Sequence, residues 1–165
     1  MIYILEGPDG VGKSTLAAAI AEKTKGHVLH CSWNKDWNME EYFEEVMEVA
    51  VELDRYQDVV IDRWAPSEWV YGNVFRGGEQ FDVYDFVAQA QRENGANLTW
   101  VMCKHPLAVS NHLKHMELRE EMFNDMTDVV ANFSLFEVDS ALPWVEYDYT
   151  KKPLKEWIDE HVTRR

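Results

Sequence analysis

The sequence predicts an α/β fold in which a parallel β-sheet is covered by helices on both faces. Short apolar runs of strand type alternate with segments of helical periodicity, which is the pattern of repeated βαβ units. The 165 residues suffice for one domain with a substantial core, and no repeat, low-complexity tract or linker-like stretch divides them. We therefore expect a single domain over residues 1–165.

Each expected strand is a short apolar run, and the runs are Ile2–Glu6, His27–His30, Val59–Asp62, Leu98–Cys103 and Val145–Tyr147. Helical spacing predicts the intervening helices over Ser14–Lys23, 38–54, 81–93 and 153–162. Gly26 and Asn94-Gly95 are suitable stops for the first and third helices, and Pro153 suits the first position of the last. The pattern of residues 107–136 also predicts helix, but their strongly polar middle indicates a mobile element rather than core.

Composition is typical of a soluble globular protein. The formal net charge is −14, from 30 acidic and 16 basic residues, which disfavours a nucleic-acid polymer as partner without excluding one. Small anions can still bind where a few cations converge in a cleft. No basic leader is seen and no apolar stretch approaches the roughly 18 residues of a membrane span, so we expect a cytoplasmic protein without a membrane partner. Cys31 and Cys103 are expected to be reduced.

Residues 7–14 carry the phosphate-loop pattern G-x-x-x-x-G-K-[ST], with an apolar run before it and an Ala-rich helix after it. Glycines let backbone N–H groups turn toward phosphate oxygens, and the start of the helix adds further N–H groups. Lys13 can reach the β- and γ-phosphates, and the Ser14 hydroxyl can ligate Mg²⁺. The pattern therefore predicts a site for ATP and Mg²⁺ formed by Gly7, Asp9, Gly10, Val11, Gly12, Lys13, Ser14 and Thr15.

The second half of such a site is an acidic residue at the end of a neighbouring strand, and Asp62 ends the run 59–62. A carboxylate there can hold Mg²⁺ through water. Arg63 follows directly and can bind the transferring phosphoryl group while stabilising its charge. The alternatives are a turn residue for Asp62 and a surface ion pair for Arg63.

Two segments resemble the thymidylate kinase and deoxynucleoside kinase family. The run DRWAPSEWVYG at 62–72 resembles the D-R-x-x-x-S-x-x-x-Y segment of thymidylate kinases, and LEGPDGVGKST at 5–15 resembles the phosphate loop of the family. Residues 96–101 match the position of its fourth strand, and 147–155 that of its last strand, adenine loop and final helix. The resemblance implies a three-layer P-loop kinase fold with a five-stranded parallel sheet in the order 2-3-1-4-5, flanking helices and a short helical lid.

The resemblance also implies roles for individual residues. Arg63 is expected to contact the phosphate of the acceptor or the transferred group, and Asp9 the sugar 3′-hydroxyl. Tyr71 is expected to pack where a 2′-hydroxyl would project, which favours deoxyribose. Ser67 belongs to the same motif, and Lys151 to the adenine loop. The alternatives are that Asp9 forms a turn, Ser67 caps a helix and Tyr71 belongs to the core.

The chain departs from the family around the base of the acceptor. Gly72 stands where thymidylate kinases carry Gln, the helix 39–53 lacks their Arg, and residues 32–37 replace their Pro-Gly loop. The resemblance therefore supports the donor site and reaction type better than the identity of the base. Trp33 and Phe43 are candidates for stacking on a base, with a place in the core as the alternative.

The lid is expected over roughly 107–125. Val11 stands where some thymidylate kinases have a phosphate-loop Arg, and enzymes without that Arg usually supply one from the lid. We expect Arg119 to close on the phosphates, with Lys114 as the other candidate and a solvated helix face as the alternative. Arg119→Ala should then lower turnover roughly tenfold or more.

Three functions fit these observations. The leading one is an ATP–Mg²⁺-dependent kinase of a deoxynucleoside monophosphate, whose ionised acceptor needs positioning more than a base. The second is a kinase for a hydroxyl acceptor, either a deoxynucleoside or a hydroxymethylated pyrimidine as nucleotide or within DNA, with Asp36 or Asp9 near the hydroxyl. The third is a nucleotide-binding switch or ATPase without a small acceptor. A homodimer through helix 81–93 stays open.

Overall fold

The computed structural model describes residues 1–108 and 123–163, and its centre is a β-sheet in which every strand pair is parallel. The sheet has five strands in the order β2-β3-β1-β4-β5. Their bounds are Ile2–Glu6 for β1, His27–His30 for β2, Val59–Asp62 for β3, Leu98–Cys103 for β4 and Trp144–Tyr147 for β5. The predicted fold class and strand order are confirmed, and only β5 begins one residue earlier than expected.

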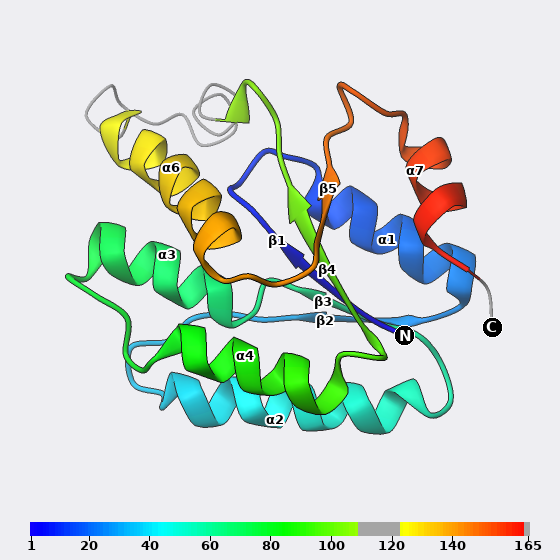
Figure 1. Cartoon of the computed structure of the whole chain (residues 1–165), viewed down its shortest axis with the longest axis horizontal. Helices are drawn as coiled ribbons and strands as arrows, with labels where there is room; N and C mark the ends of the chain where they lie inside the picture. Colours follow the sequence, from blue (N-terminus) through cyan, green and yellow to red (C-terminus); the bar gives the residue numbers. More distant parts are fainter. Residues whose placement is uncertain (109–122, 164–165) are drawn as a thin grey trace.

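Helices connect the strands on both sides of the sheet, as Figure 1 shows. Their bounds are Lys13–Thr24 for α1, Met39–Asp54 for α2, Ala65–Phe75 for α3, Val83–Asn94 for α4, Phe123–Asp139 for α6 and Leu154–His161 for α7. The Asn38 and Asp82 side chains cap α2 and α4 by accepting hydrogen bonds from backbone N–H groups of the first turn. The helices predicted over 14–23, 38–54, 81–93 and 153–162 differ from α1, α2, α4 and α7 by at most two residues at each end.

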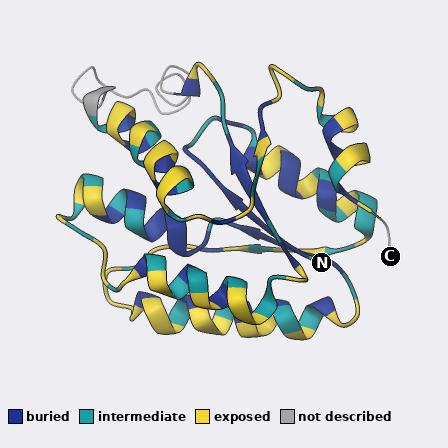
Figure 2. Ribbon diagram, viewed as in Figure 1, coloured by how far each residue is buried: buried dark blue, intermediate teal, exposed yellow. Residues whose placement is uncertain are grey.

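The core has two main layers because alternate residues of each strand point to opposite faces of the sheet. Ile2 and Ile4 of β1 join the cluster formed with α2 and α4, whereas Tyr3 and Leu5 join the cluster formed with α1 and α7. In Figure 1, α2 and α4 accordingly lie on one side of the sheet and α1 and α7 on the other. Figure 2 shows the inner strands buried and the helices striped with buried and exposed residues.

Helix α3 is the element that the periodicity did not reveal. Its apolar residues face several directions because it packs against both α4 and α6 while its first turn lies beside the sheet. Val70 joins a small third cluster with Met126, Val129 and Phe133 of α6. Without a single apolar stripe, such a helix gives a weak sequence signal.

The segment expected to form the lid falls mostly on residues 109–122, which lie outside the described residues, as do Lys114 and Arg119. Helix α6 runs to Asp139, three residues beyond the predicted end at 136. Among the described helices, none combines the length and apolar character that a bilayer crossing requires. Cys31 and Cys103 are both buried and free.

Candidate functional site

The loop between β1 and α1 has the conformation that phosphate binding requires. Gly7, Gly10 and Gly12 all have positive φ angles, of 132°, 77° and 85°. These conformations are strained for other residues but open to glycine, and they turn successive N–H groups toward one concave side. Gly12 is the N-cap of α1, so the free N–H groups of the first helical turn point the same way.

Gly7 is constrained by contact as well as by its φ angle. A Cβ atom at this position would lie 2.3 Å from the carbonyl oxygen of Cys103 on β4. The loop therefore starts in direct backbone contact with the neighbouring strand, and residue 7 has no room for a side chain.

Lys13 lies folded into this loop. Only 6% of the residue is exposed, and its Nζ donates a hydrogen bond of 2.6 Å to the carbonyl oxygen of Pro8. Burial, aided by the positive charge of Arg63, lowers the pKa of Lys13 from 10.5 to about 8. A polyphosphate bound beside Lys13 would place a compensating negative charge next to this ammonium group.

The carboxylate of Asp62 is suited to a metal ion. One of its oxygens, Oδ2, lies 3.3 Å from the Ser14 hydroxyl, which donates to it, and 3.2 Å from His30 Nδ1. The other oxygen, Oδ1, is buried and has no hydrogen-bond partner among the described residues. A buried carboxylate oxygen without a partner is costly, and Mg²⁺ prefers such hard oxygen ligands. The Asp62 and Ser14 side chains therefore fit a Mg²⁺ ion at the start of α1.

Arg63 leaves the sheet in a strained conformation, with φ of 67°. The next residue, Trp64, donates its backbone N–H to Glu6 Oε1 at 2.6 Å, and Ser67 Oγ donates to Glu6 Oε2 at 2.6 Å. Glu6 is fully buried, and burial raises its pKa to about 7 despite these bonds and the nearby positive charge. Glu6, the last residue of β1, thus anchors the first turn of α3 directly after Arg63.

The Arg63 guanidinium points back toward the phosphate loop. It forms an ion pair with Asp9 and donates a hydrogen bond of 3.1 Å from Nη1 to the Tyr71 hydroxyl. Burial alone would lower the pKa of Arg63, but Tyr71 and Asp9 raise it above the ordinary value, so the group stays charged. A positive group is therefore held between the loop and α3.

A cavity of about 270 Å³ opens beside Arg63. It is lined by Asp9, Cys31, Ser32, Trp33, Phe43, Arg63, Trp64, Ser67, Glu68, Tyr71 and Arg76. The cavity, which we call the acceptor pocket, thus contains all six residues predicted to bind the acceptor. Phe43 is buried and packs edge-on against Trp64, whereas Trp33 is 48% exposed.

The structure narrows several alternatives left open by the sequence. Ser67 does not cap α3, because the N-cap is Trp64 and the Ser67 hydroxyl is bonded to Glu6. Tyr71 is only partly buried and contacts Arg63 as well as the Phe133 ring. Asp36, a candidate base, is exposed and does not line the acceptor pocket.

Two charged residues that were not predicted from the sequence also line the pocket, Arg76 and Glu68. Arg76 follows the end of α3, and its guanidinium makes two hydrogen bonds to the Glu68 carboxylate, at 2.9 and 2.8 Å. The same guanidinium lies 4.6 Å from the centre of the Trp33 ring. Glu6 and His30 were likewise missed as partners of Ser67 and Asp62. These four residues carry no motif of their own, so contacts in space were needed to find them.

A second cavity, of about 330 Å³, lies on the other side of the phosphate loop, between Pro8 and the loop after β5. Lys151 lies at its edge, exposed and ion-paired with Glu146 at 2.6 Å. Tyr149 of the same loop packs on His105, with ring centres 4.5 Å apart, and covers Gly12. The predicted adenine loop therefore adjoins the phosphate loop.

Comparison with solved structures identifies relatives of this fold. The YorR protein from Bacillus subtilis, in complex with phosphorylated GDP, superposes with a TM-score of 0.75 at 22% identity, over 97% of this chain and 92% of YorR. Deoxyadenosine kinase from M. mycoides with bound dATP gives 0.60 at 15% identity, over 97% and 98%. The chain has the P-loop kinase fold. At these identities the likeness establishes the P-loop kinase fold and leaves the substrate open.

Sequence comparison adds less than the structural one. The family model for the ATPase family associated with various cellular activities (AAA) matches residues 3–62, which run from β1 through the phosphate loop to Asp62. No curated protein matches the chain. The sequence match thus covers only the part of the chain that contains the phosphate loop and Asp62, and the acceptor half has to be interpreted from its own geometry.

Proposed function

We propose that the protein is an ATP–Mg²⁺-dependent phosphotransferase that acts on a deoxynucleoside monophosphate. The observation that carries this proposal is the position of Arg63, a charged guanidinium that lines the acceptor pocket while paired with Asp9 of the phosphate loop. A single cation thus faces both a nucleotide-sized pocket and the place where the terminal phosphate of ATP would lie. In-line transfer between two phosphates needs this kind of bridging charge.

The donor half follows from the phosphate loop and its neighbours. The N–H groups of residues 7–14 and the Lys13 ammonium would hold the triphosphate, while Ser14 and Asp62 would hold Mg²⁺. When bound, Mg²⁺ neutralises charge on the phosphate oxygens. Lys151 and the cavity beside the loop after β5 would hold the adenine side.

The acceptor half follows from the pocket lining. Arg63 would bind the phosphate of the acceptor bidentately, Asp9 the sugar 3′-hydroxyl and Tyr71 the sugar face that lacks a 2′-hydroxyl. Trp33 and Phe43 offer apolar surface to a base. The structural neighbours hold nucleotides with different bases: YorR was solved with phosphorylated GDP, and the M. mycoides kinase with dATP and with dCMP and dCDP.

A monophosphate fits the charges of the pocket better than a hydroxyl acceptor. A hydroxyl group must lose a proton, so it needs a carboxylate able to accept one. The pocket carboxylates are Asp9 and Glu68, and each already forms an ion pair with an arginine, so neither is a free acceptor for the proton of a hydroxyl group. A deoxynucleoside acceptor remains the second candidate, because Asp9 lines the pocket and relatives include a deoxyadenosine kinase.

The test is a transfer assay with ATP labelled at the γ-phosphate and Mg²⁺. The four deoxynucleoside monophosphates, dUMP and the matching deoxynucleosides are supplied one at a time. Labelled diphosphates are the expected products. Labelled monophosphates from deoxynucleosides would instead establish the hydroxyl acceptor, and label released only as inorganic phosphate would establish an ATPase or switch. Arg63→Lys is the matched variant, because it keeps the charge but loses bidentate binding.

A further inference from the structure

We propose that Arg76, held in place by Glu68, selects the base of the acceptor. In this assignment Arg76 favours bases with a carbonyl oxygen at the edge that faces it, as in thymine, uracil and guanine, over the amino bases adenine and cytosine. The inference rests on the proposed function, since it concerns the remaining end of the same acceptor pocket.

The Arg76 guanidinium is fixed rather than free to rotate. Nη1 and Nη2 donate to the two carboxylate oxygens of Glu68, and Nη2 also approaches the Glu68 backbone carbonyl at 3.3 Å. The Glu68 side chain is 1% exposed and the Arg76 side chain 22% exposed. A buried carboxylate needs a compensating cation, so the ion pair ties Arg76 to one orientation. Trp33 stacks against the guanidinium and limits it further.

The Arg76 backbone lies at the end of α3 that is farther from the phosphate loop, and its guanidinium reaches back along the helix to Glu68 and Trp33. Helix α3 starts directly after Arg63, near the phosphate loop, and Arg76 follows its last turn. At about 1.5 Å per residue, the helix places these two backbone positions well over 10 Å apart. Both side chains nevertheless line the acceptor pocket, together with Trp33 and Phe43. With a phosphate at Arg63, the base is the part of a nucleotide that extends toward Arg76.

The chemistry of the guanidinium sets the preference. An arginine has five N–H donors and no acceptor, and the bonds to Glu68 use only part of this set. The remaining donors suit a carbonyl oxygen, and paired Arg contacts to guanine O6 and N7 are the commonest specific base contact of this kind. An exocyclic amino group would instead present N–H to N–H. The Glu68 oxygens, which could accept from an amino group, each already accept a bond from Arg76, and the Glu68 side chain is buried.

The turn after α3 is built to bring Arg76 to this position. The Gly72 carbonyl oxygen accepts backbone hydrogen bonds from Arg76 at 2.9 Å and from Gly78 at 3.0 Å. A Cβ atom at residue 72 would lie 2.7 Å from the Gly78 carbonyl oxygen and 3.0 Å from the Glu79 backbone. The chain can therefore fold back over α3 only because residue 72 is glycine. Among the residues that line the pocket, Arg63 and Arg76 are the two cations.

Equilibrium binding tests the assignment without any transfer step. Isothermal titration with dTMP, dUMP, dGMP, dCMP and dAMP should show the three carbonyl-bearing nucleotides binding about tenfold or more tightly than the two amino-bearing ones. Arg76→Ala should remove this advantage, because it deletes the donors and frees the Glu68 oxygens to accept from an amino group. Equal weakening of all five nucleotides by Arg76→Ala would overturn the proposal, as would a wild-type protein without base preference.

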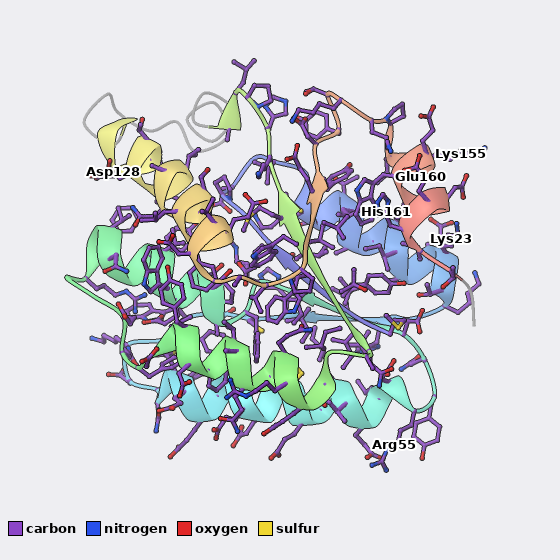
Figure 3. All side chains as sticks on the ribbon, viewed as in Figure 1. Lys23, Arg55, Asp128, Lys155, Glu160 and His161 are labelled. Atoms are coloured by element: carbon purple, nitrogen blue, oxygen red, sulfur yellow. The ribbon has the colours of Figure 1, made fainter. Side chains whose placement is uncertain are left out.

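Two controls keep the result interpretable. Arg55→Ala removes another arginine that is ion-paired with a glutamate, Glu52, at the far end of α2 (Figure 3), and should change neither affinity nor preference. If Arg76→Ala is poorly folded, the double variant Glu68→Gln with Arg76→Gln replaces the ion pair by a neutral amide pair, and it should bind ATP normally with no base preference. Retained preference in a folded double variant would equally overturn the proposal.

The outcome is separable from that of the proposed function. Selective binding without phosphoryl transfer would refute the transferase activity and support the role of Arg76. Transfer to all five nucleotides with equal affinity would support the activity and refute the role of Arg76.

Discussion

The site is formed by ionisable side chains that are buried or partly buried. Lys13, Glu6, Asp62 and Arg63 come from three different segments but lie around the carboxyl ends of β1 and β3. Because burial changes the relative free energies of charged and neutral forms, Lys13 and Glu6 should affect pH-dependent measurements.

Lys13 should make ATP binding depend on pH. The lowered pKa, about 8, means that the ammonium form decreases as the pH rises through that value, whereas a bound triphosphate stabilises it. We expect ATP affinity to fall between about pH 7 and 9, with proton uptake on binding in that range. Calorimetry in two buffers of different ionisation enthalpy measures this uptake. Lys13→Ala should abolish both transfer and the uptake, and an unchanged uptake would contradict the assignment.

Glu6 should make stability depend on pH in the opposite sense to an ordinary salt-bridged carboxylate. Its folded pKa of about 7 lies above the ordinary 4.5, so the folded state binds this proton more tightly. The associated stabilisation is present below about pH 4.5 and is lost as the pH rises to about 7, on the order of 3 kcal/mol at most. Denaturant unfolding of wild type and Glu6→Gln from pH 5 to 8 isolates this effect. Parallel stability curves for the two proteins would rule it out.

Asp62 should govern the response to magnesium. Asp62→Asn keeps the shape but removes the charge that suits a divalent cation, so half-maximal activity should need about tenfold more Mg²⁺. Asp159→Asn is the matched control, since that carboxylate is exposed and forms an ion pair with Lys23. Magnesium titrations that coincide for wild type and Asp62→Asn would dismiss the metal-binding role.

The phosphate loop is the element in which sequence and structure agree most closely. A local pattern was sufficient there, because the loop conformation depends on glycines at fixed spacing. Helix α3 shows the opposite case: the start of its first turn depends on Glu6, 58 residues before Trp64 in the sequence, and its end depends on Gly72 and Arg76. Strand pattern and phosphate loop could be predicted, whereas Glu68 and Arg76 could not, since their pairing depends on a backward turn that has no periodic signal.

The contact between the phosphate loop and β4 can be tested by substituting a glycine. Gly7→Ala combines an unfavourable φ of 132° with a clash against the Cys103 carbonyl, whereas Gly78→Ala has a φ of 144° in open space. We expect Gly78→Ala to cost about 1 kcal/mol of unfolding free energy and Gly7→Ala several kcal/mol. Chemical denaturation of both variants gives the difference. Equal costs would show that the contact between the loop and β4 is looser than described.

At the level of the whole molecule, the strong negative charge should let the protein bind free nucleotides while disfavouring nucleic-acid polymers. With a net charge of −14, the protein should be repelled by DNA, while Arg63 and Arg76 attract a single nucleotide into the acceptor pocket. A short DNA duplex should therefore fail to displace a fluorescent nucleotide at about 0.1 M salt. Effective displacement would instead favour the hypothesis that the protein phosphorylates a hydroxyl group of a modified pyrimidine within DNA. The homodimer stays a prediction, to be tested by sedimentation.

The turn after α3 has a consequence for how such proteins diversify. It lies outside the sheet, and the backbone hydrogen bonds described for Arg76 and Gly78 end on Gly72 of the same helix. Changes within this short stretch could therefore alter which nucleobase is accepted while the phosphate-handling groups stay as they are. Substrate range in this architecture would then evolve, or be engineered, by rewriting one peripheral turn.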